Sequence, residues 1–237
     1  MRKYIGWLLV SALLAFAALA PLKPANALQK KDEDTSGWTT EFNEDKKDLG
    51  PTGNNPYFPL EPGQFVILEG NGEQVTETVL SETKKVDGVE CRVIEVRETK
   101  KGKLIEITRD YYAISKRTNS VYYFGEDVDI YKDDKIVGHK GAWLSGEKGA
   151  KFGLMMPGTP LLKGRYFQEI APGIAMDRGE IVGMNETVTV PAGKFEKCLK
   201  IEDTTALDPK VREIKYYAPG IGIIQDVDHK LTKYGKK

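Results

Sequence analysis

The chain is poor in the residues on which hydrolytic and metal-dependent catalysis depends. It has two histidines, His139 and His229, and two cysteines among 237 residues. Nucleophile-and-base catalysis needs an imidazole or an equivalent base close to a Ser or Cys. The sequence also lacks a Gly-x-Ser-x-Gly elbow, a His-Glu-x-x-His pair and a Gly-x-x-x-x-Gly-Lys phosphate loop. We therefore expect a non-enzymatic protein, and no motif predicts a cofactor or a metal.

The chain also has no excess of Lys and Arg over Asp and Glu. If residues 1–27 are removed, 32 Lys and Arg face 35 Asp and Glu, so the remaining chain is weakly acidic. Nucleic acids and anionic membranes select basic surfaces that neutralise phosphates. Neither is an expected partner.

Long apolar runs are absent except at the beginning of the chain. Arg2 and Lys3 precede an apolar run from residue 5 to 20, and Ala25-Asn26-Ala27 fits a small-residue cleavage site. The run is shorter than the roughly 20 residues of a spanning helix, and prolines follow it at once. We expect a signal peptide over 1–27, cleavage after Ala27, a periplasmic or extracellular location, and no stable membrane span after cleavage.

Cys91 and Cys198 leave two alternatives open. An oxidising compartment favours a bridge between them, which would close a loop of about 107 residues. The other alternative is two separate buried thiols.

The remaining chain divides by composition. Residues 28–55 are charged and poor in apolar side chains, which predicts a flexible polar arm. From residue 56 to 237, β-branched and aromatic runs are cut every eight to twelve residues by turn residues such as Asn71-Gly72 and Asp133-Asp134. This spacing predicts a single all-β antiparallel domain with few, short helices.

Alternation along one of these runs predicts how its faces are used. Ile105, Ile107 and Tyr111 share one parity of a strand, while Glu106, Thr108 and Asp110 share the other. We expect the apolar face to be buried and the acidic face to be mostly wet.

Four short matches recur in the same order at offsets of 101 to 109 residues. They are PLEPGQF with PLLKGRY, ETV with ETV, Cys91 with Cys198, and YYA with YYA. Constant spacing favours an internal duplication, with halves near 57–138 and 157–229, over the reuse of common strand and turn sequences. Each half alone would bury a marginal core, so the two are expected to complete one sheet or sandwich together.

Candidate ligand-binding residues lie in and near an irregular Gly- and Pro-rich segment, 138–164. His139 and Trp143 open the segment, Met155 and Met156 would suit an adaptable apolar lining, and Tyr112 and Tyr123 lie on neighbouring predicted strands. The plainer alternatives are a turn histidine and a cross-strand aromatic ladder. The acidic run Glu126, Asp127, Asp129, Asp133 and Asp134 lacks calcium-loop spacing and is expected at a solvated hairpin edge.

Three further motifs carry a family resemblance: FPLEPG from Phe58, VPAGKFEKCLK from Val190, and YYAPGIG from Tyr216. In these the chain resembles a family of uncharacterised secreted bacterial proteins, from about residue 55 to 225. The resemblance implies no activity. More loosely, the segments are similar to those of curved-sheet periplasmic carrier-like proteins, which implies a strongly curved sheet, a half-barrel or a sandwich.

Two functions follow as hypotheses. The first is an exported binding or carrier-type protein of the bacterial envelope, whose apolar concave surface holds a hydrophobic small molecule. The second is a structural or protein-interaction module, tethered to an envelope protein through the arm. A hydrolase built on His139 ranks last.

Overall fold

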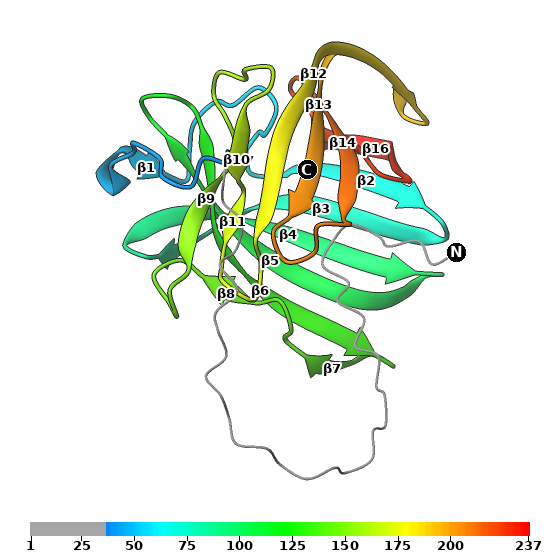
Figure 1. Ribbon diagram of the computed structural model, residues 1–237. Helices are drawn as coiled ribbons and strands as arrows, with labels where there is room; N and C mark the ends of the chain where they lie inside the picture. Colours follow the sequence, from blue (N-terminus) through cyan, green and yellow to red (C-terminus); the bar gives the residue numbers. More distant parts are fainter. Residues whose placement is uncertain (1–36) are drawn as a thin grey trace.

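A computed structural model describes residues 37–237, which form an all-β chain with one short 3₁₀ helix, η1 (Lys46–Asp48) (Figure 1). The expected signal peptide and residues 28–36 lie outside the described residues. The antiparallel all-β prediction is confirmed. In the described part of the chain no helix is long and apolar enough to cross a membrane.

Two meanders of long strands make up most of the sheet. The first consists of β2 (Gln64–Gly70), β3 (Glu73–Val86), β4 (Val89–Lys100), β5 (Lys103–Ser115) and β6 (Val121–Lys132). The second consists of β12 (Asp177–Val190), β13 (Gly193–Thr205), β14 (Arg212–Ala218), β15 (Gly222–Asp226) and β16 (His229–Lys236). The short strands are β1 (Leu49–Gly50), β7 (Lys135–Gly138), β8 (Trp143–Leu144), β9 (Lys151–Met156), β10 (Arg165–Phe167) and β11 (Glu169–Ile170).

Tight turns connect the strands of the first meander. Both central residues have positive φ at Asn71-Gly72, Asp87-Gly88 and Lys101-Gly102, and again at Asp133-Asp134 between β6 and β7. Two-residue turns with this backbone match the twist of antiparallel strands, and Asn, Asp and Gly adopt it at low cost. The turns predicted at residues 71–72 and 133–134 are confirmed.

The sheet curves through 321° into a nearly closed barrel, with strand order β10-β12-β13-β14-β15-β16-β2-β3-β4-β5-β6-β9-β11. The meanders join where β16 pairs with β2, with Lys236 opposite Gln64. The other junction depends on residues 165–170, which we call the closing segment. Its first part, β10, pairs with β12, and its second part, β11, pairs with β9. The two ends of the sheet are therefore held by strands that only Gln168 separates.

The interior is lined by one hydrophobic cluster with members from both meanders, among them Val66, Ile94, Leu199, Tyr217 and Leu231. A second cluster lies on the opposite face of β4, β5 and β6 and contains Tyr111, Tyr122 and Phe124. Adjacent aromatic residues such as Tyr122 and Tyr123 therefore serve opposite faces. The sheet curves further than the half-barrel that we expect from the sequence, because it encloses its core almost completely.

The expectation of a flexible arm over residues 28–55 does not hold for its described part. Phe42 packs against Tyr122, with 5.6 Å between ring centroids, and β1 pairs with β5, with Leu49 opposite Ser115. Asn55 is buried and donates to the carbonyl of Asn119 at 2.9 Å. The few apolar residues of this polar stretch cover the outer cluster, which is why it is ordered.

The matched sequence pairs fall on strands that follow one another in the same order in the two parts of the chain. Glu77 lies in β3 and Glu186 in β12, while Cys91 lies in β4 and Cys198 in β13. This order agrees with a duplication, but it does not measure a superposition of the two halves. The duplication stays a prediction.

Both cysteines are free thiols in the structure. Cys91 belongs to the outer cluster and Cys198 to the interior cluster, so they lie on different faces of the sheet. Burial raises the pKa of Cys91 to about 12 and also raises that of Cys198. Of the two alternatives, the structure has two separate buried thiols.

Candidate binding site inside the sheet

The interior of the curved sheet carries acidic side chains between its apolar ones. On β5, Glu106, Thr108 and Asp110 are buried and share a parity with Tyr112 and Ile114 of the interior cluster. The expectation that this acidic face would be wet is wrong. Both faces of β5 are covered toward its C-terminal end, so the simple rule of one buried face fails there. Other inward-facing acids are Glu73, Glu77, Glu98, Glu126, Glu169, Asp203, Glu213 and Asp226.

A β-bulge at Gly125 turns Glu126 inward. Across β5 and β6, Asp110 is opposite Glu126, but Tyr112 is opposite Tyr123, so β6 has one additional residue between the two pairs. Gly125 has a φ of +122°, and a Cβ atom there would lie 2.2 Å from the carbonyl oxygen of Trp143. The bulge changes the alternation, so Tyr123 and Glu126 both face the interior. This corrects the prediction that Glu126 lies at a solvated hairpin edge.

Gly125→Ala tests this bulge. The methyl group would collide with the backbone of β8 and strain the left-handed φ. We expect a loss of at least about 2–3 kcal/mol in the free energy of unfolding. Urea unfolding would measure it, with Gly72→Ala as the control, because no atom lies closer than 4.0 Å to a Cβ there although φ is also positive. Equal losses for the two variants would contradict a role for the close approach.

Aromatic rings form a continuous stack through the interior. Tyr112 stacks on Tyr123 with ring centroids 4.6 Å apart, and Phe58 lies 4.8 Å from Tyr112. Trp143 meets Tyr123 edge to face at 5.4 Å. Tyr112, Tyr123 and Trp143, predicted as binding residues from separate parts of the sequence, are thus in contact.

An apolar pocket lies on the Phe58 side of this stack. Its cavity volume is about 40 Å³, within about 530 Å³ of empty space that includes open solvent. Its lining includes Phe65, Val79, Ile94, Met155 and Ile223, together with two carboxyl groups, Glu77 and Asp110. The pocket is amphipathic, because two carboxyl groups interrupt an apolar lining.

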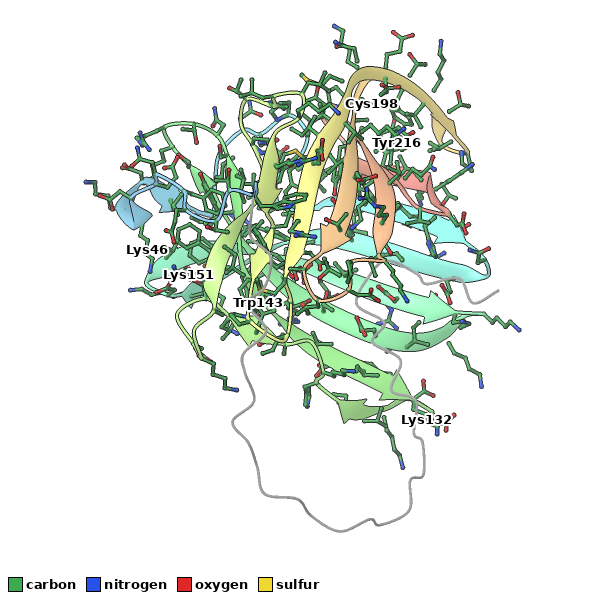
Figure 2. All side chains as sticks on the ribbon, in the orientation of Figure 1. Lys46, Lys132, Trp143, Lys151, Cys198 and Tyr216 are labelled. Atoms are coloured by element: carbon green, nitrogen blue, oxygen red, sulfur yellow. The ribbon has the colours of Figure 1, made fainter. Side chains whose placement is uncertain are left out.

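A larger cavity of about 230 Å³ lies on the Trp143 side of the stack. Glu126 and Trp143 line it, together with Ala150, Ala171 and Ile174 from the loops that follow β8 and β11. Figure 2 shows Trp143 toward the lower end of the molecule in this view and Cys198 at the upper end. The two cavities share no lining residue, and the aromatic stack runs from Phe58 and Tyr112 of the apolar pocket to Trp143 of the other cavity.

Burial changes the ionisation of the interior acids. It raises the pKa of Glu77 to about 8, with further contributions from the charges of Asp110 and Asp226, and it raises the pKa of Asp110 to about 7. Burial also raises the pKa of Glu126 and of Glu169 well above the usual range. Burial is the largest cause, and the charge of Asp110 adds to it in both cases. A substantial part of the lining is therefore protonated at neutral pH.

One interior cation is held by two of these acids. The Nζ of Lys215 lies 3.0 Å from Asp203 Oδ2 and 3.9 Å from Asp226 Oδ2, and the Lys215 side chain is 12 % exposed. Burial alone would lower the pKa of Lys215, but Asp226 and Asp203 together raise it above its ordinary range. The register of β13, β14 and β15 places Asp203 beside Glu213 and Lys215 opposite Asp226.

The remaining predicted site residues lie in different surroundings. Met155 lines the apolar pocket, and Met156 is fully buried in the interior cluster. His139 is largely exposed, and its Nδ1 lies 2.7 Å from the carbonyl oxygen of Val128 and 2.9 Å from Asp129 Oδ1. The structure does not bring His139 into either cavity. Across residues 37–237, no three His, Cys, Asp or Glu side chains are arranged to hold a metal ion.

Sequence reasoning missed Glu77, Asp110 and Glu126 as site residues. The available signal was a strand such as β5, in which acids and large apolar residues share one parity, as Asp110 and Tyr112 do. That pattern is unusual for a solvent-facing surface. It indicates an interior that is partly polar.

Comparisons with known proteins give little. No family model and no curated protein matches the chain. Among solved structures, it is similar to a Parabacteroides distasonis protein provisionally described as a lipoprotein, with 11 % identity and a TM-score of 0.39. The similarity covers 78 % of this chain and 100 % of that one. At this score it carries no argument about function, and the family resemblance stays a prediction.

Proposed function

We propose that this protein is an exported, non-enzymatic binding or carrier-type protein of the bacterial envelope that holds a small amphipathic molecule inside its curved sheet. The apolar pocket with two carboxyl groups in its lining supports this function. Phe65, Val79 and Ile223 would contact the apolar part of the ligand, while Glu77 and Asp110 would meet its polar end. Export rests on the signal peptide predicted over residues 1–27.

The shape of the pocket limits what it accepts. Its cavity volume is small, so a thin or planar molecule fits better than a bulky one. Met155, with its flexible and polarisable side chain, would let the wall adapt to different ligands. Because Glu77 and Asp110 are acidic, a neutral or cationic polar group is favoured over a carboxylate or a phosphate.

Binding of the neutral dye N-phenyl-1-naphthylamine tests the proposal. We expect the native protein to enhance the fluorescence of the dye, and Val79→Phe, which adds volume to the pocket wall, to weaken binding about tenfold or more. Leu162→Ala is the matched control, because Leu162 is 56 % exposed and lies outside the pocket. Far-UV circular dichroism would verify that each variant is folded. An absence of dye binding, or equal binding by Val79→Phe and the native chain, would count against an apolar binding site.

The alternative, an interaction module tethered through the arm, gains no support from residues 37–55. Phe42, Leu49 and Asn55 are engaged with the sheet itself. A deletion of the whole arm would therefore remove part of the fold along with any tether.

A further inference from the structure

The cavity beside Trp143 contains polar atoms that the described residues leave unsatisfied. Glu126 Oε1 and Trp143 Nε1 are both buried without a hydrogen-bond partner, and both residues line the cavity while being only 5 % exposed. Buried polar groups are nearly always hydrogen-bonded, to protein or to another molecule. An acceptor and a donor without partners, in two residues that line one cavity, indicate a molecule that offers both a donor or positive group and an acceptor.

The charges around the cavity specify the sign of that molecule. Glu126 faces Asp110 across β5 and β6, and Glu106 of β5 and Glu169 of β11 also act on it electrostatically. Of the other charged lining residues, Asp127 is paired with Lys84 at 2.7 Å, and Glu147 and Lys148, of opposite charge, are both exposed. The field in the cavity therefore favours a cation, and the ring of Trp143 adds a surface to which ammonium groups are attracted.

We propose that this cavity binds a small organic ammonium compound that carries a hydroxyl group. The positive nitrogen would lie near Glu126, and the hydroxyl oxygen would accept from Trp143 Nε1. The cavity measures about 230 Å³, so the ligand is small. Because this cavity shares no lining residue with the apolar pocket, the inference goes beyond the proposed function and is tested independently of it.

Ionisation couples to such binding. Burial, and then the charges of Asp110, Glu169 and Glu106, raise the pKa of Glu126, and the Tyr123 hydroxyl opposes this only in part. Around Glu169, Asp177, Asp110 and Asp203 raise the pKa further while Lys215 lowers it. A bound cation stabilises the ionised carboxylate. Binding at neutral pH should therefore release a proton, and affinity should increase as the pH rises.

Calorimetric titration of the native chain with choline and with ethanolamine tests the proposal. The neutral comparison is 3,3-dimethylbutan-1-ol, which has the shape of choline without its charge. We expect the ammonium compounds to bind at least about tenfold more tightly than the alcohol, and to bind more tightly at pH 8 than at pH 6. Titrations in two buffers with different ionisation enthalpies would detect the released proton.

Variants assign the binding to this cavity. Glu126→Gln should weaken choline binding about tenfold and remove most of its pH dependence, while Glu90→Gln, which is exposed and outside the cavity, should change the affinity less than about twofold. Ala150→Leu, which fills the cavity without altering a carboxyl group, should also reduce binding. The proposal is overturned if choline and the alcohol bind equally, if neither ammonium compound binds at about 10 mM, or if Glu126→Gln and Ala150→Leu, both folded, bind choline as the native chain does.

Discussion

Lys215→Met is expected to lower the free energy of unfolding by about 3–5 kcal/mol at neutral pH. The ammonium group of Lys215 lies between Asp203 and Asp226, and all three side chains are nearly inaccessible. Methionine has a similar length but no charge, so the substitution leaves two buried carboxylates without their cation. Removing one member of a buried ion pair costs far more than removing an exposed charge.

Urea unfolding of Lys215→Met and of a control, Lys210→Met, would measure this loss. Lys210 is exposed, in the loop before β14, and its substitution should change stability by less than about 0.5 kcal/mol. Adding Asp203→Asn to Lys215→Met should recover part of the loss, because one of the two uncompensated charges disappears. A loss below about 1 kcal/mol for Lys215→Met would mean that solvent reaches the triad and screens it.

The second large effect is an unusual dependence of stability on pH. Burial raises the pKa of Glu98 to about 8, and the charges of Glu106 and Glu73 contribute. Burial also raises the pKa of Glu106 to about 7. These two residues face each other across β4 and β5, where like charges repel.

The direction of the dependence follows from proton counting. Below the ordinary carboxyl pKa near 4.5, Glu98 is protonated in both the folded and the unfolded chain. Between about 4.5 and 8 the unfolded chain releases the proton and the folded chain keeps it, so stability falls as the pH rises. Each additional proton retained by the folded chain contributes about 1.4 kcal/mol per pH unit. Asp127, whose pKa is lowered below its ordinary value of 3.8, titrates at more acidic pH and does not oppose this trend.

We therefore expect the chain to be more stable at pH 5 than at pH 8. Glu98→Gln should raise the free energy of unfolding at pH 8 by about 1–2 kcal/mol and reduce the slope between these values, since the amide carries no charge at either pH. Glu90→Gln, exposed on the same strand, is the control and should leave the slope unchanged. Denaturant unfolding at several pH values would provide both quantities, and a stability that increases from pH 5 to pH 8 would contradict the proposed burial of these acids.

Local sequence chemistry predicted much of the fold. Turn type and side-chain alternation depend on neighbouring residues in the chain, as at Asn71-Gly72 and at Tyr122 and Tyr123. The strands, their turns and the two faces were therefore predictable. The sequence predicts that Tyr123 and Trp143 belong to one site, but it does not predict their contact. That contact depends on how β8 pairs with β6.

The acidic interior was not predictable by the same means. An acid between apolar residues ordinarily indicates a solvent-facing position. The pattern therefore predicts a wet position for Asp110, and it gives no signal for the burial of Glu98. The burial of Asp110 and Glu98 depends on protonation. The burial of Asp203 depends on Lys215, which lies on the next strand. Gly125 reverses the alternation of β6 through a close approach to Trp143, and no local pattern announces that contact.

The closing segment described above has a consequence for how water and ligands enter the interior. It is bound to β12 by three residue pairs and to β9 by two, whereas β2 and β16 share six; β15 and β16 also share only two, but a two-residue turn connects them. The sheet should therefore separate first along residues 165–170, leaving both meanders intact. Such an opening would hydrate Glu169, which belongs to that segment, and its ionisation would hinder reclosure. Alkaline conditions would thus favour a form in which the strands at residues 165–170 are separated, and acidic conditions would favour the form in which they are paired.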